Sequence, residues 1–312
     1  MIRESLTMSR QKKAAVINDI SGYGRCAITV ALPIISKLKV QCCPVPTSIF
    51  SNHTGFPTYY FDDYTERMQP FIEQWKKLGL KFDGIQTGFL GSKKQIEIVS
   101  GFIRDFRQEE TIVVVDPIMG DNGKSYATYT EEMCQEMRRL VTLADIITPN
   151  LTEACILTGT GYHEEKWKMK EIRKLAMELR RMGPKKVVIT GIPQGEYIAN
   201  YCCEAFAGGS ESSIDIQGDG EPGIQTNYQP GVQDLGAGER LLRTMKVGTQ
   251  RCGTGDIFAA IITADAVNGV AFDVSVKKAS NFIKKSILKS IEMEIPLTDG
   301  VCFEEILDTL KA

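Results

Sequence analysis

The chain has 312 residues, of which 43% are hydrophobic and 24% are charged, and its formal net charge is −2. This composition is typical of a globular protein, and a chain of this length can bury a self-sufficient hydrophobic core. The small net charge creates no overall field that would attract nucleic acid or an acidic membrane, so any bound phosphate must be held locally.

The chain carries no sign of export or membrane insertion. No apolar run is long enough to span a membrane, and the N-terminus lacks the apolar region of a signal peptide. The nine cysteines form no C-x-x-C pair and lie mostly among apolar neighbours, as small core residues in a reducing compartment do. We therefore expect a cytoplasmic protein with no nucleic-acid or membrane partner. We also expect residues 1–12 to form a loose N-terminal tail.

Short β-branched runs alternate with helical patterns along the chain. Strands are expected at residues 13–18, 40–48, 84–86, 111–115, from 146, and at 186–190. Helices are expected at residues 27–38, 65–78, 93–106, 131–141, 151–157 and 166–181. This alternation predicts the α/β fold class, with a mainly parallel sheet covered by helices on both faces.

One segment near the C-terminal third breaks the alternation. Residues 208–239 are rich in Gly, Ser, Gln, Asp and Pro, with almost no apolar periodicity. This is too long for an ordinary connection, so we expect an exposed, mobile insertion between strands near 197–205 and 241–247. It is either a surface loop or a lid or oligomer contact. Residues 13–312 are otherwise expected to form a single domain.

Several polar residues follow expected strands. Asp19, Asp116, Asn150 and Thr190 all lie near the carboxyl ends of such strands. Active sites of α/β sheets lie beyond these ends. We therefore expect the four side chains to converge in space.

The most informative motif is Gly253-Thr254-Gly255-Asp256, which is followed at once by the apolar run 257–262. Small residues let backbone N–H groups approach an anion closely, and the apolar run predicts a buried helix whose positive end faces that anion. Asp256 stands where a carboxylate could accept a proton from a hydroxyl that attacks a phosphoryl group. An ordinary glycine turn before a helix is the alternative.

Three further clusters combine with this turn. Residues 50–55 form a polar cluster after the second strand, which could also be a simple hydrogen-bonded turn. Asp116 and Asp121 flank a Pro- and Gly-shaped turn, where paired acids could hold Mg²⁺ through its waters. Within residues 144–153, Asn150 or Thr152 could cap a helix that has Glu153 in its first turn.

Two nucleotide-binding motifs are nearly present and fail. Residues 22–27 fit the dinucleotide pattern G-x-G-x-x-A, but residues 41–48 lack the acid that would bind the ribose. Residues 123–125 resemble the end of a Walker loop, but Ile118 stands where its first glycine is required. Both observations argue against a Rossmann dehydrogenase and a P-loop enzyme.

Four motifs in this order resemble the pyridoxal (pyridoxine, pyridoxamine) kinase family of the ribokinase-like superfamily. They are SNHTG at residues 51–55, DPIMGD at 116–121, LADIITPN-x-x-E at 143–153 and GTGDIFAA at 253–260. The resemblance covers the chain from about Lys13 onward, apart from the insertion. It implies a ribokinase-like three-layer αβα sandwich.

The resemblance also implies a role for each matching residue. Asp256 is the catalytic base, and Gly253, Thr254 and Gly255 form the anion hole. The nucleotide side includes Asp121, Asn150 and Thr190, and the acids around the metal are Asp116 and Glu153. The vitamin pocket includes His53, Thr54, the ring-covering Phe89 and, at a position where some relatives carry serine, Asp19.

The reaction that the resemblance implies is transfer of the γ-phosphoryl group of ATP to the 5′-hydroxymethyl group of a B6 vitamer. It further implies Mg²⁺, possible use of a monovalent cation such as K⁺, and a homodimer. Two alternatives stay open. A hydroxymethylpyrimidine kinase of the same superfamily commonly carries cysteine where this chain has Asp256, and a non-catalytic B6- or nucleotide-binding protein would have no need of that base.

Overall fold

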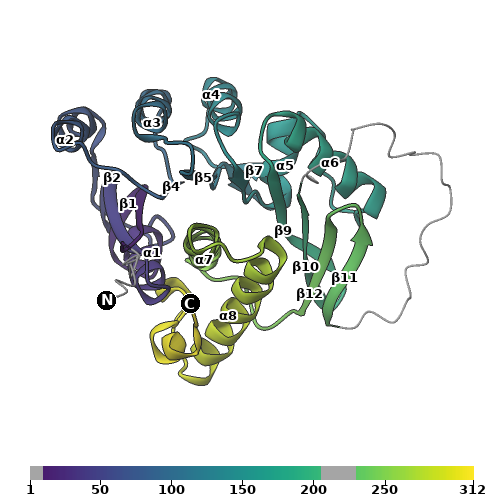
Figure 1. The fold of residues 1–312 in the computed structure, drawn as a ribbon. Coiled ribbons are helices and arrows are strands. Elements are labelled where there is room, and N and C mark those ends of the chain that lie inside the picture. The colour runs from purple at the N-terminus through teal and green to yellow at the C-terminus, as the bar shows by residue number, and fades with distance from the viewer. Residues whose placement is uncertain (1–9, 205–229) are drawn as a thin grey trace, which may run out of the picture.

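The computed structural model describes residues 10–204 and 230–312. None of the helices within these two ranges combines the length and the hydrophobicity of a membrane span. The described residues form a large sheet with helices on both faces (Figure 1). The predicted α/β fold class and its three layers are confirmed.

The main sheet has ten strands in the order β11-β12-β10-β9-β8-β5-β4-β1-β2-β3. The six strands from β9 to β2 in this order pair in parallel, and antiparallel pairs occur only beyond them. The strands of this sheet are β1 (Lys13–Tyr23), β2 (Gln41–Asn52), β3 (Phe61–Asp63), β4 (Gly84–Thr87), β5 (Ile112–Val115), β8 (Ile146–Ile147), β9 (Lys186–Gln194), β10 (Tyr197–Glu204), β11 (Gly231–Gly236) and β12 (Glu239–Met245). A separate hairpin pairs β6 (Gly120–Asp121) with β7 (Lys124–Ser125).

Helices cover the two faces of the sheet in two groups (Figure 1). One face carries α2 (Thr65–Lys77), α3 (Lys93–Phe106), α4 (Glu131–Val141), α5 (Leu151–Thr158) and α6 (Met169–Arg181). The other carries α1 (Ala27–Lys37), α7 (Thr254–Asn268) and α8 (Phe272–Glu292). Short 3-10 turns at Leu297–Asp299 and Glu304–Thr309 follow α8.

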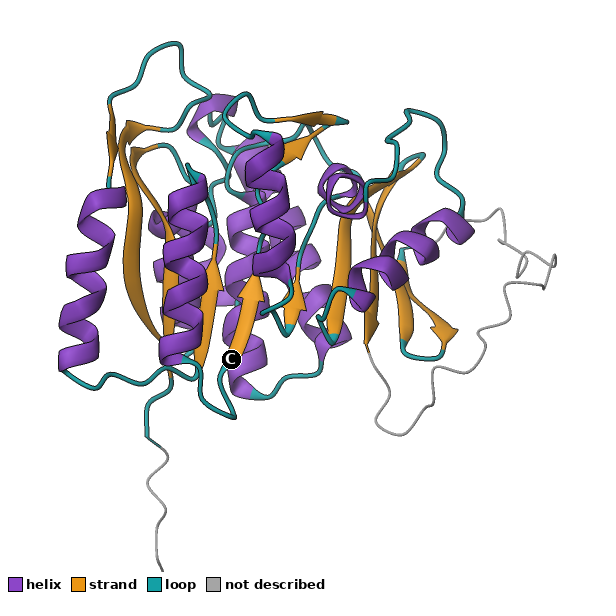
Figure 2. Ribbon diagram, turned by 90° about the horizontal axis from the view of Figure 1, so that it is seen from above, coloured by secondary structure: helices purple, strands orange, loops and turns teal. Residues whose placement is uncertain are grey.

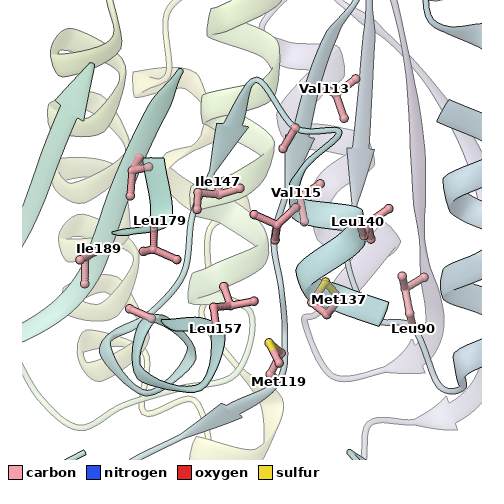
Figure 3. Packing of buried hydrophobic residues seen from close by; sticks show 14 of the residues in the cluster. Leu90, Val113, Val115, Met119, Met137, Leu140, Ile147, Leu157, Leu179 and Ile189 are labelled. Atoms are coloured by element: carbon pink, nitrogen blue, oxygen red, sulfur yellow. The ribbon is translucent and has the colours of Figure 1, made fainter. Parts of the chain in front are cut away.

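Two hydrophobic cores lie on opposite faces of the sheet because successive residues of a strand point to opposite sides. Val113 and Val115 of β5 belong to the core under α2–α6, whereas Val114 between them packs with α7 and α8. Figure 3 shows part of the first core, where Val115 and Ile147 from the strands lie among side chains of α4, α5 and α6. The parallel strands are therefore apolar on both faces, as the continuous runs in the sequence predicted.

The first two strands run further than the sequence suggested. β1 continues to Tyr23 and β2 to Asn52, so Asp19 lies within a strand rather than at its end. The register of the β1–β2 pair shifts between Asn18 and Ile20, which makes an irregularity at Asp19. The predicted strand ends were too early because the polar residues beyond them still pair through their backbones.

The structure describes the last part of the expected insertion and the end of the expected tail. Residues 231–236 form β11, which pairs with β12, so the predicted insertion at 208–239 was wrong for its last part. Backbone pairing with a neighbouring strand does not need apolar periodicity, which is why the sequence hid this edge strand. Residues 205–229 of the insertion and 1–9 of the tail lie outside the described residues. Arg10, within the expected tail, forms an ion pair with Asp83 at 2.8 Å.

Candidate active site

The polar residues singled out from the sequence gather at one edge of the sheet. The central parallel strands all point the same way, and in Figure 2 their arrowheads are directed toward one edge. Phe89 follows β4, Asp116 follows β5, and Asn150 follows β8. Thr190 of β9 forms a bridge with Asn150, so these two neighbours are in direct backbone contact. The sheet therefore brings Asp116, Asn150 and Thr190 of the predicted set to one edge, and Asp19, within β1, lies close enough to Asp256 for that charge to raise its pKa.

The glycine turn begins helix α7 at this edge. Gly253 is the N-cap residue with φ +87°, and a Cβ at this position would lie 2.2 Å from the carbonyl oxygen of Arg25, so only glycine fits. By contrast, a Cβ built on Gly255 meets no atom within 4 Å, so this side of the turn faces open space. The first N–H groups of a helix have no intrahelical partner. The turn therefore offers free amides and the positive end of α7 to an anion.

Asp256 lies in the first turn of α7. Burial raises the pKa of its carboxyl group, while hydrogen bonds from the Ala27 N–H and the Asn18 side chain act in the opposite direction. The Asn18 Nδ2 donates to Asp256 Oδ1 at 3.2 Å. A carboxylate that is desolvated and held in this way is suited to accept a proton.

Asn18 is a site residue that the sequence analysis passed over in favour of its neighbour. Its Oδ1 accepts hydrogen bonds from the backbone N–H groups of Asp19 and Phe89, at 2.9 and 2.7 Å. A Cβ at Gly88 would lie 2.4 Å from the Asn18 side chain, so the chain passes close beside it. Asn18 thus joins β1, β4 and the carboxylate of Asp256. Its position at the end of the apolar run 14–17 was the signal that could have revealed it.

Asp116, which follows β5, and Glu153, in the first turn of α5, are two buried acids. Asp116 is 8% exposed and Glu153 is 4% exposed. Desolvation raises the pKa of Asp116, and the charges of Glu153 and Asp256 raise it further, while a hydrogen bond from Thr148 opposes the shift. Three carboxyl groups that repel one another in a partly dry site favour the binding of a cation.

The two oxygens of Glu153 are already used by backbone donors. Oε1 accepts from the Met119 N–H at 3.0 Å and Oε2 from the Asn150 N–H at 2.8 Å. Asn150 Oδ1 in turn accepts from the Glu153 N–H, which completes a capping box at the start of α5. Burial raises the pKa of Glu153 to about 7 despite these hydrogen bonds. Glu153 therefore shapes the turn after Asp116 as well as adding charge to the site.

The residues predicted for the nucleotide side lie along the same edge. Asn150 Nδ2 donates to the Gly120 carbonyl at 2.8 Å, which ties α5 to the β6–β7 hairpin. Asp121 of that hairpin accepts from Gln250 Nε2 at 2.5 Å. Gln250 lies three residues before Gly253, so this contact connects the hairpin to the glycine turn. The sequence indicated residues 244–251 only as a wall for the adenine base and did not single out Gln250.

No group of three or more His, Cys, Asp or Glu side chains in residues 10–204 and 230–312 is arranged to hold a metal by itself. Mg²⁺ commonly keeps several waters and is held by one or two carboxylates together with substrate phosphates. Asp116 fits this requirement. Thr148 Oγ1 donates to its Oδ1 at 3.0 Å, whereas both carboxylate oxygens of Glu153 accept hydrogen bonds from backbone N–H groups.

The residues predicted for the vitamin pocket lie nearer the β2–β3 end of the sheet. Thr54 is exposed. Both ring nitrogens of His53, in contrast, have backbone partners. Nδ1 accepts from the Gly55 N–H at 3.0 Å, so Nε2 carries the proton that is donated to the Thr298 carbonyl at 2.6 Å. His53 therefore closes the loop after β2 against the segment after α8.

Phe89 and Asp19 flank Asn18 on this side. Phe89 belongs to an aromatic group with Phe50, whose ring centroid lies 6.1 Å away, and Phe50 also contacts Phe61 at 4.8 Å. Burial and the charge of Asp256 raise the pKa of Asp19 to about 7, while a hydrogen bond from Ser21 opposes that shift. An aromatic wall beside a partly protonated acid is able to hold a polar heteroaromatic ring.

All nine cysteines of the chain are free thiols, as expected. Cys26 and Cys252 contact each other beside Asp256, and this contact together with burial raises the pKa of Cys26 far above its usual range. A thiol with a raised pKa is a poor nucleophile. Cys26 therefore serves packing rather than covalent catalysis.

Comparisons with known proteins agree with this geometry. The family model described as phosphomethylpyrimidine kinase matches residues 32–216, more than half of the chain. A protein from Bacteroides thetaiotaomicron, provisionally described as a phosphomethylpyrimidine kinase, is 34% identical, covers 97% of this chain and 95% of its own, and superimposes with a TM-score of 0.84. A second crystal form of that protein contains pyridoxal.

Several curated relatives are described as pyridoxal kinases. A pyridoxal kinase of Arabidopsis thaliana is 34% identical over 157 residues, so the match spans only about half of each protein. A pyridoxal kinase of Leishmania donovani, solved with ADP, has a TM-score of 0.78 and covers 95% of this chain, but at 20% identity it supports the fold alone. The chain belongs to this family of phosphomethylpyrimidine and pyridoxal kinases. The family resemblance seen in the sequence is confirmed, as is a kinase of the ribokinase-like type.

Proposed function

We propose that this protein transfers the γ-phosphoryl group of ATP to the 5′-hydroxymethyl group of a B6 vitamer. The observation that carries the proposal is Asp256, which is held by Asn18 at the start of α7 beside the free amides of residues 253–255. The hydroxyl of the vitamer would lie against Asp256, and the γ-phosphoryl group would lie against the amides. Such a reaction depends mainly on positioning and on charge stabilisation.

Each protein group has a defined task in this proposal. Asp256 accepts the hydroxyl proton as the oxygen attacks phosphorus. The N–H groups of Gly253, Thr254 and Gly255 stabilise the charge on the transferring oxygens, and one such donor typically contributes about 10²–10³-fold in rate. Asp121, Asn150 and Thr190 would contact the nucleotide. Asp116 and Glu153 would hold Mg²⁺ through its waters, and the ion would neutralise charge on the phosphates.

The vitamin ring would lie between the exposed loop after β2 and the aromatic group around Phe89. Asp19, with a pKa near 7, could donate a hydrogen bond to the ring or accept one, and Thr54 is free to contact it. His53 would act on the ring only through its carbon edge, because its nitrogens are occupied. The relative crystallised with pyridoxal supports a B6 vitamer as the substrate.

A hydroxymethylpyrimidine kinase is the second candidate, because the matching family model and the Bacteroides relative bear that description. Asp256, where that branch commonly has cysteine, favours the B6 vitamers. Release of ADP should be measured with pyridoxal, pyridoxine, pyridoxamine and hydroxymethylpyrimidine in parallel. We expect the highest kcat/KM with a B6 vitamer. Phosphorylation of hydroxymethylpyrimidine alone would identify the protein as a hydroxymethylpyrimidine kinase. Phosphorylation of none of the four compounds would indicate a binding protein.

The remaining properties are proposals as well. We propose a cytoplasmic homodimer with a single kinase domain and no nucleic-acid or membrane partner. Tyr59, Tyr60 and Phe61 are exposed by 49%, 67% and 44% at the β3 edge of the sheet, which is the type of surface that a second copy covers. Sedimentation velocity of the full chain and of Tyr60→Ser tests this assembly. The family resemblance also implies a monovalent cation, and activity in potassium compared with tetramethylammonium salts tests that prediction.

A further inference from the structure

A buried arginine lies directly behind the catalytic turn. Arg251 precedes Gly253 by two residues and is only 8% exposed. Its Nη1 donates to the carbonyl oxygens of Pro296 and Gly300 at 3.0 and 3.1 Å, and its Nη2 donates to that of Ile295 at 2.9 Å. These three bonds go to neutral carbonyl dipoles. They therefore orient the guanidinium without cancelling its positive charge.

The segment that accepts these bonds, residues 295–300, joins several parts of the site. Besides Arg251, it accepts hydrogen bonds from His53, through the Thr298 carbonyl, and from the backbone N–H of Arg25, through the Asp299 carbonyl. The loop after β1 and the loop after β2 therefore meet the catalytic turn on this one segment. Arg251 is the residue that fastens the turn to it.

Arg251 also contacts the turn itself. Its backbone carbonyl accepts a hydrogen bond from Thr254 Oγ1 at 3.3 Å. Thr254 is the first helical residue of α7 and supplies one of the free amides. A shift of Arg251 would therefore move the amides that face the phosphoryl group. A displacement of about 1 Å in a positioning group can cost about 10²-fold in rate.

The guanidinium brings a positive charge close to the glycine turn, because it binds the Gly300 carbonyl and a Cβ at Gly300 would lie 3.1 Å from the Cys252 carbonyl oxygen. Asp116, Glu153 and Asp256 are all negative when ionised, and ATP adds further negative charge. Backbone carbonyl oxygens grouped around a cation are the ligand type that binds monovalent cations such as K⁺ in proteins. Here the two terminal nitrogens of a guanidinium, which is charged at all accessible pH values, already bind the carbonyl oxygens of Ile295, Pro296 and Gly300.

We propose that Arg251 is a positioning residue that serves as a built-in monovalent cation. It holds the phosphate-binding turn in place and, in contrast to what the family resemblance implies, makes added K⁺ unnecessary in this chain. The inference rests on the proposed kinase function for its rate measurements. It concerns this chain's own residues, so binding of MgATP tests it independently of turnover.

The experiment compares the wild-type protein with Arg251→Met, Arg251→Lys and the control Arg138→Met. Arg138 also donates to backbone carbonyls, those of Ile156 and Leu157, but at the end of α5 away from the catalytic turn. Activity and calorimetric MgATP affinity are measured in KCl and in tetramethylammonium chloride at equal ionic strength. Thermal unfolding of each variant records its stability.

For the wild type we expect the same kcat and MgATP affinity in both salts. For Arg251→Met we expect a fall in kcat of about 10- to 100-fold with the vitamer KM changed less than about threefold. We also expect KCl or guanidinium chloride to restore part of that loss. Arg251→Lys should lie between the two, and Arg138→Met should lose stability without a change in kcat or in salt response.

Three results would overturn the proposal. They are a wild-type protein that needs K⁺ for MgATP binding, an Arg251→Met variant whose kcat is unchanged, and a loss that neither KCl nor guanidinium restores. If Arg251→Met does not fold, the wild-type salt comparison and Arg251→Lys decide the question. If the wild type phosphorylates no vitamer but binds MgATP equally in both salts, the function fails while the cation assignment stands.

Discussion

The two sides of the proposed site differ in burial and in charge. The phosphate side, formed by Asp116, Glu153 and residues 253–256, lies at the centre of the sheet and holds carboxyl groups whose pKa values are raised by desolvation. The ring side, formed by Asp19, His53, Thr54 and Phe89, lies toward the β2–β3 edge and includes exposed and aromatic side chains. Dry, fixed groups strengthen electrostatic stabilisation, whereas an accessible edge can accept different rings. The phosphate side should therefore determine the rate of phosphoryl transfer, and the ring side should determine which substrate binds.

The strongest test of this division is Asp256→Asn. Asparagine keeps the size of the side chain but cannot accept the hydroxyl proton as a carboxylate does, so we expect kcat to fall by about 10³-fold. MgATP affinity and thermal stability should change little. The control is Asp145→Asn, since Asp145 binds Arg107 at the opposite edge of the sheet. Nearly wild-type kcat for Asp256→Asn would show that Asp256 is not the catalytic base.

A smaller effect is expected from Asp116→Asn on the same side. Removing one of the charges that attract the metal should lower kcat by about 10²-fold and raise the Mg²⁺ concentration needed for half-maximal activity. Steady-state rates across a magnesium titration measure both quantities. An unchanged magnesium dependence would assign Asp116 to packing, in agreement with its hydrogen bond from Thr148.

On the ring side, Phe89→Ala should act on binding rather than on chemistry. Loss of one aromatic face is expected to raise the KM for the vitamer by about 5- to 10-fold, with kcat within about threefold. Phe61→Ala is the matched control, because Phe61 belongs to the same aromatic group but lies on the outer strand β3. Equal effects of the two variants would show that the group stabilises the edge without contacting the substrate.

The smallest change is expected from Asp19→Asn, and it concerns stability. Because the pKa of Asp19 is raised from 3.8 to about 7 in the folded protein, its protonated form favours folding. That contribution is fully present below about pH 4 and is lost as the pH rises through 7. Asparagine stays neutral, so the variant should gain about 1–3 kcal/mol at pH 8 relative to wild type, and little at pH 4. Urea unfolding at both pH values measures the difference, and an equal gain at both would exclude this titration.

Much of the site could be predicted from the sequence because it depends on local chemistry. The run after Asp256 marked a helix, and the turn before it had to be small, as the 2.2 Å approach of a Cβ at Gly253 to Arg25 explains. Asn150 and Glu153 were also evident as a cap, since a capping box is a relation between residues three apart. Such features need no knowledge of the rest of the chain.

The sequence by itself thus determined the alternation of strands and helices, the strand ends that carry Asp116 and Asn150, and the glycine turn before Asp256. Only the tertiary structure decided which distant groups meet. Asn18 reaches Asp256 across 238 positions, Arg251 reaches the carbonyl oxygens of residues 295–300, and β11 pairs at the far edge without an apolar pattern. Local propensity acts over a few residues, whereas these contacts depend on how the sheet and its helices pack, and no short pattern encodes that arrangement.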